Sequence, residues 1–520
     1  MSRKWSFYGR SEELGALLEH LRSRKWFFGT IRGRRRIGKT ALVQQALTTL
    51  AADEPGPARR LLVELPDSTP ADLATVFGQA LRMEGLDQTP GIRHPIVNLP
   101  EVAWALGALC ASGITVLLDE FQVCHRGPLR GLPSLLKAEV DRLQNLSGPG
   151  GLILLGSVQS EMEALLSDRQ APLFGRRTFD ISLGPWRLPT LFEVAEAHGA
   201  GAPDRILTLW TLFGGVPKYW RDYAALEKDD TGEAWISWAA RLCQGLFLRT
   251  DSPLREEGTS LHGRELRRNH LAVLRAVARL GPCPHADLQT ALPGLSLGPY
   301  LRTLTRDLRL IERLSPVFAR TGHHRTRYVV SDPLLLAWLR VMQAARQAAR
   351  IRSAASVAKS LVARLATLEG HAFERLVRDG VEARSRAGIG FRLTDRVRGY
   401  WNRPRTADAS IELDLVAWNE EDRVVRFGSC KRNPAKHTQA ACRKFREQVG
   451  RFLRSAGRRF ASWTNQQVLF APRFPVAQRA VLESRGWMCR DLADMRRGLV
   501  EANRRGSGPG RISAKVTGDD

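Results

Sequence analysis

Residues 33–40 carry the pattern G-x-x-x-x-G-K-[ST], and they follow an apolar, strand-like run. In such a loop Gly33 and Gly38 let the backbone curl until successive N–H groups point at phosphate oxygens. Lys39 would reach the β and γ phosphates, and Thr40 would offer its hydroxyl to Mg²⁺. A helical stretch follows at once, so its N-terminal dipole would face the same anion. The order of strand, loop and helix predicts a nucleoside triphosphate site, whereas a basic Gly-rich turn without a ligand is the alternative.

Two further runs of mostly apolar residues end in polar side chains. Residues 113–120 end in Asp119 and Glu120, a pattern typical of a central parallel strand buried on both faces. Asp119 would hold Mg²⁺ through water, and Glu120 would polarise the attacking water as a general base. Residues 151–157 end in Ser157, where a γ-phosphate sensor would lie. The alternative is that these polar residues merely end buried strands.

These stretches resemble the archaeal-type ATPases of the AAA+/STAND group of P-loop NTPases, which often carry a winged helix and a nuclease-like C-terminal domain. The matching stretches lie along nearly the whole chain, at residues 7–10 with Glu13, 33–40, 118–122, 155–157, 172–177, 214–219 and 331–333. The resemblance implies an α/β fold class: a P-loop NTPase parallel sheet with a helical lid, a winged helix-turn-helix and a C-terminal α/β restriction-endonuclease-like domain. It implies ATP and Mg²⁺ as cofactors.

The resemblance also implies further residues of the nucleotide site. Gly9 and Arg10 would lie near the adenine, and Pro217 would belong to the helical lid. Arg176 would be an arginine finger or a sensor, because a guanidinium near the γ-phosphate neutralises charge that develops during transfer. Two ordinary surface arginines, Arg176 and Arg177, are the alternative. A site that took Arg176 from a second copy would require an oligomer, and the sequence leaves the oligomeric state open.

A chain of 520 residues exceeds what one core usually serves. We expect a P-loop ATPase core at residues 1–190, a helical lid at 191–262, a winged helix at 263–338, a helical linker at 339–366, a PD-(D/E)xK nuclease-like domain at 367–500 and a disordered tail at 501–520. The seven cysteines form no C-x-x-C pair, which indicates reduced thiols. Neither an apolar signal segment nor a run of about 18 apolar residues occurs. We therefore expect a soluble cytoplasmic protein with no membrane partner.

The formal net charge of +26 favours encounter with polyanions. Three helical stretches and two strand-like runs between residues 264 and 335 follow the order of a winged helix-turn-helix. Its third helix would enter a major groove, and its basic tip at residues 320–325 would contact phosphate. DNA is therefore the predicted macromolecular partner. The alternatives are arginines on ordinary solvated faces and a winged helix that serves only as a packing module.

The C-terminal residues carry a second candidate site. Glu374 lies on a predicted helix, Glu412 and Asp414 on a strand, and Lys431 at the end of the next strand. This order resembles the PD-(D/E)xK nucleases, in which acids hold a divalent metal for phosphodiester hydrolysis and Lys positions the water. A period of two puts Glu412 and Asp414 on the same face of their strand.

Position 429 departs from that pattern, because it is Ser where the family has an acid. A neutral hydroxyl cannot replace a carboxylate's charge in holding a hard cation. Glu412, or Glu447 on the following helix, would have to substitute. The sequence thus leaves three functions open: an ATPase that acts as a nucleotide-dependent switch on DNA, an ATP-gated metal-dependent DNA nuclease, and a STAND-type signalling scaffold that binds protein partners.

Overall fold

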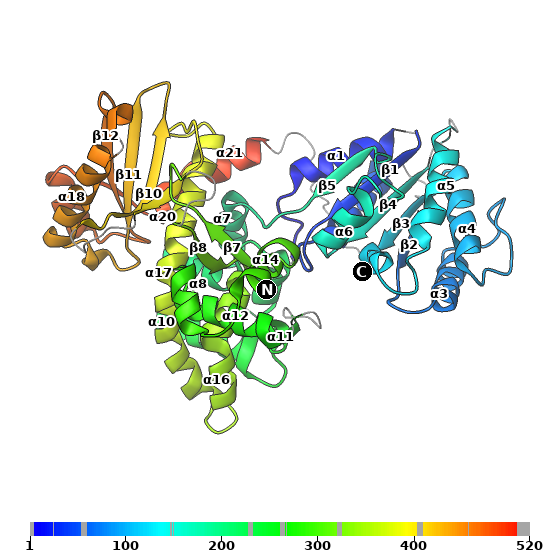
Figure 1. The fold of residues 1–520 in the computed structure, drawn as a ribbon, viewed down its shortest axis with the longest axis horizontal. Coiled ribbons are helices and arrows are strands. Elements are labelled where there is room, and N and C mark those ends of the chain that lie inside the picture. The colour runs from blue at the N-terminus through cyan, green and yellow to red at the C-terminus, as the bar shows by residue number, and fades with distance from the viewer. Residues whose placement is uncertain are drawn as a thin grey trace, which may run out of the picture. The chain divides into compact units, whose positions relative to one another are not determined.

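The computed structural model describes residues 5–23, 25–53, 60–145, 148, 150–226, 232–260, 266, 268–319, 325–402, 409–455 and 457–506. The chain divides into two compact units, residues 6–185 and residues 186–520 with 1–5. Each unit has its own sheets and its own buried cores (Figure 1).

The first unit is a five-stranded parallel sheet covered by helices on both faces (Figure 1). The strand order is β2-β3-β4-β1-β5. The strands are β1 (Phe27–Arg32), β2 (Arg60–Glu64), β3 (Thr115–Asp119), β4 (Gly151–Gly156) and β5 (Phe179–Ser182). The helices are α1 (Ser11–Arg22), α2 (Lys39–Asp53), α3 (Pro70–Met83), α4 (Leu99–Ala111), η1 (Phe121–His125), α5 (Leu132–Gln144) and α6 (Gln159–Leu166).

Successive strand residues are buried on opposite faces of this sheet. Phe28 and Leu118 pack in a core that includes buried side chains of α3, α4 and α5. Their neighbours Phe27 and Leu117 pack in a second core with α1 and α2. A strand buried on both faces has no side that faces solvent, which explains the continuous apolar runs in the sequence. The predicted α/β fold class with a parallel sheet in the first unit is confirmed.

The second unit begins with helices and a small antiparallel sheet. The first helices are α7 (Leu188–Ala197), α8 (Pro203–Phe213), α9 (Pro217–Leu226), α10 (Trp235–Cys243), η2 (Gln244–Leu248) and α11 (Glu257–Ser260). Next come α12 (Arg268–Leu280), β6 (Cys283–Pro284), α13 (His285–Ala291), α14 (Leu297–Arg302), η3 (Thr303–Asp307), β7 (Ile311–Leu314) and β8 (Arg327–Val330), with strand order β6-β8-β7.

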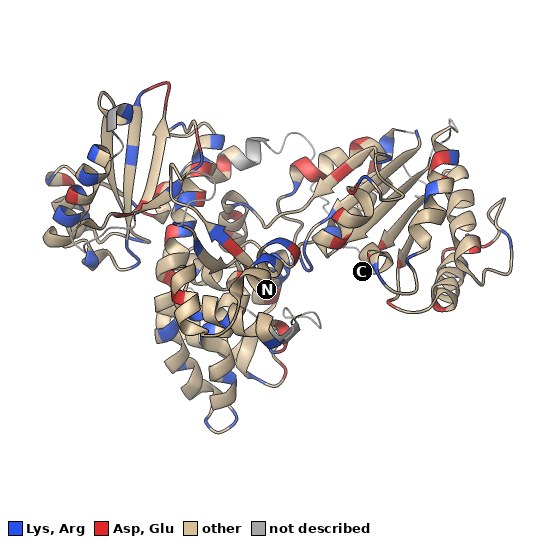
Figure 2. Cartoon of the chain, viewed as in Figure 1, with Lys and Arg blue, Asp and Glu red and all other residues tan. Residues whose placement is uncertain are grey.

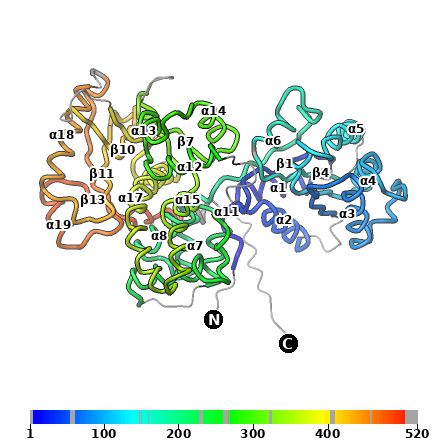
Figure 3. Tube along the Cα trace, turned by 60° about the horizontal axis from the view of Figure 1, so that its bottom comes forward, coloured from blue at the N-terminus to red at the C-terminus, as the bar shows by residue number. Residues whose placement is uncertain are grey.

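The rest of the second unit holds a long helix and a mixed sheet of order β13-β12-β11-β10-β9. The helices are α15 (Pro333–Ala337), η4 (Trp338–Met342), α16 (Gln343–Ala348), α17 (Ala354–Arg386), η6 (Pro434–Lys436), α18 (Gln439–Ser455), η7 (Gly457–Phe460), α19 (Val476–Ser484), α20 (Leu492–Arg496) and α21 (Leu499–Gly506). The strands are β9 (Arg398–Trp401), β10 (Glu412–Asn419), β11 (Val424–Cys430), β12 (Thr464–Phe470) and β13 (Met488–Arg490). Figures 1 and 3 both show α18 beside this sheet.

The predicted domain boundaries stay predictions, and two of them can be compared with the elements of the structure. The boundary between a linker and a nuclease-like domain at residues 366/367 falls inside α17, a single helix of 33 residues. Its buried stripe runs through that point, with Leu361, Leu365, Leu368 and Phe373 all buried. The predicted core at residues 1–190 can be compared with the first compact unit, residues 6–185.

The tail predicted to be disordered from residue 501 is wrong for residues 501–506. These residues complete α21, whose first turn anchors the helix because Leu499 and Val500 are buried. Residues 507–520 lie outside the described part of the chain. Within that described part, every helix is too short or too polar to span a bilayer.

Candidate functional site

The loop at residues 33–40 connects the end of β1 to the start of α2. Gly38 has a φ of 95°, a conformation that glycine adopts without strain. A Cβ on Gly33 would lie 2.7 Å from the carbonyl oxygen of Leu183 and 2.9 Å from Cγ2 of Ile37. Helix α2 begins at Lys39, so its free N–H groups point into the loop. The two glycines are therefore required by backbone geometry and by close packing.

Lys39 and Thr40 lie at the inner side of this loop. Lys39 is 7% exposed, and its Nζ donates to the carbonyl oxygen of Gly33 at 3.1 Å. Burial lowers the pKa of the Lys39 ammonium, and the carboxylates of Asp119 and Glu120 oppose that shift. Thr40 Oγ1 donates to Oδ2 of Asp119 at 3.0 Å. The loop and the end of β3 thus bring a cation, a hydroxyl and two acids together.

Glu120 follows β3 in a left-handed backbone conformation, with a φ of 55°. For a non-glycine residue this conformation costs about 1–3 kcal/mol, and residues strained in this way cluster at functional sites. Its carboxylate accepts hydrogen bonds from Nε2 of Gln122 and from Oγ of Ser157, the latter at 3.1 Å. Gln122 Oε1 in turn accepts from the backbone N–H of Ser157 at 3.0 Å. The structure therefore places Ser157 in contact with the predicted general base.

Sequence reasoning missed two partners of Glu120. The side-chain amide of Gln122 hydrogen-bonds to both Glu120 and Ser157. Gln122 lies in the stretch 118–122 that carries the family resemblance, but no role was predicted for it. Arg35, in the phosphate loop, places Nη2 at 3.7 Å from Oε2 of Glu120. A polar residue two positions after the Asp-Glu pair was the available signal for Gln122. Arg35 gave no signal of its own, because the loop contains three successive arginines.

Arg10 connects the start of α1 to the phosphate loop. Its guanidinium donates to the carbonyl oxygens of Ile37 at 3.4 Å and Gly184 at 2.5 Å, and to Oε1 of Glu13 at 3.1 Å. Gly9 and Arg10 both have positive φ, at 62° and 64°. They therefore lie beside the loop, and their proximity to an adenine stays a prediction. Pro217 begins α9 in the second unit, so its assignment to the nucleotide site also stays a prediction.

Arg176 is not directed at the phosphate loop in this structure. Its guanidinium forms a bidentate salt bridge with the carboxylate of Asp141 on α5, with N–O distances of 2.5 and 3.0 Å. It also donates to the carbonyl oxygens of Pro172 and Phe174, each at 3.1 Å. An Arg–carboxylate pair of this geometry fixes both side chains. Arg176 thus fastens its own loop to α5, and a role as arginine finger would require this pair to open.

Two residues that precede the predicted basic tip pack against the β9–β13 sheet. Val317 belongs to the buried core of the β9–β13 sheet, and its backbone N–H donates to the carbonyl oxygen of Gly399 at 3.0 Å. Phe318 lies against Trp418, with ring centroids 5.2 Å apart. Val317 is therefore buried and Phe318 packs against the sheet while staying partly exposed, whereas the predicted phosphate contact concerns the tip at residues 320–325 and stays a prediction. Residues 320–324 of the tip lie outside the described residues.

The predicted nuclease residues come together only in part. Asp414 Oδ2 accepts from the backbone N–H of Cys430 at 2.7 Å and lies 3.8 Å from Nζ of Lys431. Glu374 on α17 is near enough for Asp414 to raise its pKa, after burial as the larger cause. Glu412 instead pairs with Arg327 at 2.7 Å, and its side chain is 57% exposed. The described residues contain no group of three His, Cys, Asp or Glu side chains placed to hold a metal ion.

A β-bulge explains why the strand pattern misled. The pairing of β10 with β9 shifts register between Leu413 and Val416. Leu413 and Val416 consequently pack in the same core, although strict alternation would put them on opposite faces. Glu447, the other predicted substitute for an acid at position 429, lies on α18 and pairs with Arg443 at 3.9 Å.

Glu374 gives the second unit a testable pH dependence. Burial, with repulsion from Asp414, raises the pKa of Glu374 to about 8. In the unfolded chain this carboxyl has an ordinary pKa near 4.5. Between these values only the unfolded state releases the proton, so stability falls as the pH rises from about 4.5 to 8. We expect Glu374→Gln to gain about 3 kcal/mol in unfolding free energy over wild type at pH 8 relative to pH 5.

Urea unfolding at pH 5 and pH 8 measures this difference. Glu421→Gln, in the exposed turn after β10, is the matched control and should follow wild type at both pH values. If the unfolding free energies of wild type and Glu374→Gln changed with pH in the same way, Glu374 would have the same pKa in the folded and unfolded states.

Comparison with known proteins gives matches over different parts of the chain. The family DUF234, described as "Archaea bacterial proteins of unknown function", matches residues 338–444. An uncharacterized protein of Methanocaldococcus jannaschii is 24% identical over 432 residues, covering 82% of this chain and 87% of that protein.

Two solved structures are similar to the chain at low sequence identity. The Walker-type ATPase of Pyrococcus abyssi is 19% identical with a TM-score of 0.46, covering 65% of this chain and 98% of that one. The ORC2 protein of Aeropyrum pernix is 17% identical with a TM-score of 0.44, covering 69% of this chain and 96% of that one. The stretch similar to the DUF234 family contains Glu374, Asp414 and Lys431.

Proposed function

We propose that this chain binds ATP with Mg²⁺ and hydrolyses the nucleotide, and that its nucleotide state acts as a switch on DNA. The observation that carries the ATPase proposal is the convergence of Lys39, Thr40, Asp119 and Glu120. Thr40 and Asp119 are in hydrogen-bond contact, and both acids act electrostatically on Lys39. Few arrangements other than a phosphate and cation site require a buried lysine beside two acids and a glycine loop.

Each residue has a role that its position supports. The loop N–H groups and Lys39 bind the phosphates, and Thr40 with Asp119 would hold Mg²⁺. When bound, that ion offsets negative charge on the phosphates. Glu120 orients and deprotonates the attacking water, with Gln122 and Ser157 fixing its carboxylate. Gly9 and Arg10 are assigned to the adenine side and Pro217 to the lid.

The DNA part of the proposal is supported by the second unit. Its elements over residues 268–330 have the three helices and paired strands of a winged helix. Arg302 and Arg306 are exposed at spacing i, i+4, so they lie on one side of the α14–η3 segment. Two cations on one side of the third helix suit a contact with the phosphates of a DNA groove.

Two alternatives remain from the sequence. An ATP-gated nuclease would use Glu374, Asp414 and Lys431, and DNA cleavage lost in Asp414→Ala would favour it. A signalling scaffold would bind protein partners and no DNA. The DNA switch is preferred to the nuclease because Glu412 pairs with Arg327 and Ser429 supplies no charge.

Lys39→Ala tests nucleotide binding directly. Hydrogen bonds to charged groups contribute about 1.5–3 kcal/mol, so we expect the Kd for ATP with Mg²⁺ to rise about 10- to 100-fold. Isothermal titration calorimetry measures the change. Lys137→Ala, an exposed lysine on α5 of the same unit, should bind like wild type. Unchanged affinity in Lys39→Ala would refute the proposed phosphate site.

A further inference from the structure

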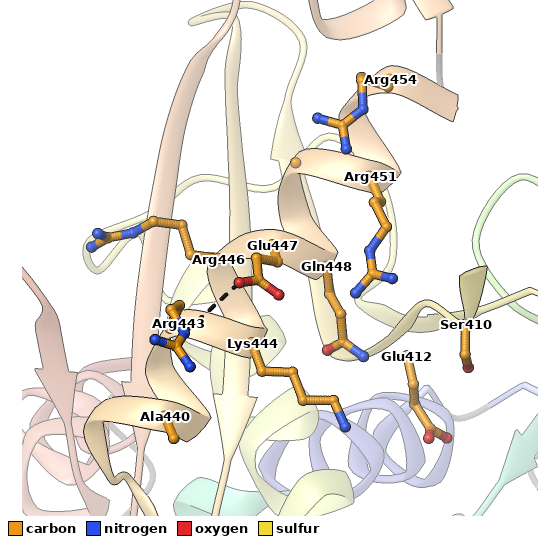
Figure 4. A pocket seen from close by; sticks show the side chains of 11 residues that line it. Ser410, Glu412, Ala440, Arg443, Lys444, Arg446, Glu447, Gln448, Arg451 and Arg454 are labelled. Atoms are coloured by element: carbon orange, nitrogen blue, oxygen red, sulfur yellow. Dashed lines mark ion pairs between the residues drawn. The ribbon is translucent and has the colours of Figure 1, made fainter. Parts of the chain in front are cut away.

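A groove of about 930 Å³ runs along α18 in the second unit, and the start of β10 forms part of its rim (Figure 4). Five of its lining residues are cations on α18: Arg443, Lys444, Arg446, Arg451 and Arg454. Figure 2 shows the same helix banded with Lys and Arg. We call this surface the α18 groove.

The amphipathic sequence of α18 places these cations toward solvent. Cys442, Phe445, Val449 and Phe452 are buried in the core of the β9–β13 sheet, so the opposite side of the helix is left for charged residues. Gly450 lies among the lining residues. Glycine in a helix interior costs about 1 kcal/mol relative to alanine, and at this lining position it adds no side chain to the groove.

The two carboxylates of the groove do not neutralise it. Glu447 pairs with Arg443 at 3.9 Å, and Glu412 pairs with Arg327 from β8 at 2.7 Å. In the described part of the chain, Lys444 and Arg454 have no carboxylate partner. Arg446 lies over the ring of Trp487, 4.6 Å from its centroid. This contact orients the guanidinium but does not neutralise its positive charge. The groove therefore carries uncompensated positive charge.

The form of this surface suits one class of polyanion. From Arg443 to Arg454 the helix rises about 16 Å, enough to follow several phosphates spaced about 3.4 Å apart along the axis of one duplex strand. None of the described lining residues is aromatic, so the groove offers no platform for stacking unpaired bases. It also presents no large apolar side chain for insertion into a lipid surface. These properties favour the backbone of double-stranded DNA.

We propose that the α18 groove binds the sugar–phosphate backbone of duplex DNA without reading its sequence. The proposal deepens the DNA part of the proposed function and does not depend on nucleotide hydrolysis. It adds a contact surface outside the winged helix, whose wing residues 317–318 are packed against the sheet. Lys444 and Arg454 are its most informative members because both are exposed and lack a carboxylate partner among the described residues.

The test measures binding of the full chain to a labelled 30-base-pair duplex of arbitrary sequence by fluorescence anisotropy, over a series of salt concentrations without nucleotide. Each lost phosphate contact lowers the slope of log K against log salt by about 0.9, so Lys444→Gln/Arg454→Gln should lose about 2 from the slope. The affinity should fall about 10-fold near 0.15 M salt. The charge-preserving exchange Lys444→Arg/Arg454→Lys should bind like wild type.

The matched control is Lys359→Gln/Arg364→Gln, which removes one exposed lysine and one exposed arginine from α17. Equal losses in the two double Gln variants, or no loss in the groove variant, would overturn the proposal. Stronger binding to single strands, to duplex RNA or to phosphatidylserine vesicles, with the same dependence on Lys444 and Arg454, would also overturn it. ATP hydrolysis is measured in parallel on the same variants. Because the DNA-binding assay contains no nucleotide, a failure of the groove proposal can be told apart from a failure of the ATPase proposal.

Discussion

Glu120→Gln is expected to lower the rate of ATP hydrolysis by at least about 100-fold while ATP binding stays within about threefold of wild type. An amide cannot take the proton of the attacking water, but its oxygen still accepts the hydrogen bonds from Gln122 and Ser157. Gln has the same Cβ and side-chain shape as Glu, so the substitution adds no steric cost to the left-handed backbone at position 120. The loss should therefore appear in kcat and not in the affinity for ATP.

Release of phosphate at saturating ATP measures kcat, and calorimetry measures affinity. Glu84→Gln, at an exposed position after α3, removes a carboxylate from the same unit and should leave both quantities unchanged. Hydrolysis by Glu120→Gln at a near wild-type rate would assign the general base to another residue. Loss of binding in that variant would instead mean that Glu120 supports the loop.

Arg432→Ala is expected to destabilise the second unit by about 3–5 kcal/mol, because it leaves a buried carboxylate without its cation. Glu369 is fully buried on α17, and its oxygens accept from Nε of Arg432 and from Oγ1 of Thr208, each at 2.7 Å. Trp235 donates to Oγ1 of Thr208 at 2.9 Å and covers the Arg432 guanidinium at 4.7 Å. The cluster joins α8, α10, α17 and the segment after β11.

The pH dependence and a second variant test this cause. Burial raises the pKa of Glu369, while the charge of Arg432 and the hydrogen bond from Thr208 oppose that shift, so removal of Arg432 should raise the pKa further. Stability is then lost as the pH rises above about 4.5, and Arg432→Ala should be worse at pH 8 than at pH 5.5. The double variant Arg432→Ala/Glu369→Gln should recover most of the loss in urea unfolding. A double variant as unstable as Arg432→Ala would point to lost packing on Trp235 instead of an unpaired charge.

The sequence predicted those features that depend on backbone pattern and local spacing. The glycines and Lys39 of the loop are constrained within eight residues, and the apolar runs of β3 and β4 follow from burial on both faces. The contact between Thr40 and Asp119 also follows, because the phosphate loop and the end of β3 lie at the same edge of a parallel sheet. These are the parts of the site that a motif specifies directly.

The partners of individual side chains were not predictable in the same way. Gln122 with Ser157, and Arg176 with Asp141, each join residues 35 positions apart. Their pairing depends on the packing of α5, η1 and the neighbouring loops, for which no short pattern exists. The bulge in β10 is a comparable case, since one extra residue changes which side chains share a face while the composition of the strand is unchanged.

The length of α17 restricts how the second unit can vary. One residue inserted into a continuous helix rotates everything beyond it by about 100°. In α17 such an insertion between Glu369 and Glu374 would turn either the carboxylate that pairs with Arg432 or the one beside Asp414 away from its partners. Insertions and deletions that preserve both contacts must therefore come in lengths close to whole helical turns. The helix therefore fixes the relative orientation of two carboxylate clusters, one of which also contains Thr208 and Trp235 from the predicted lid.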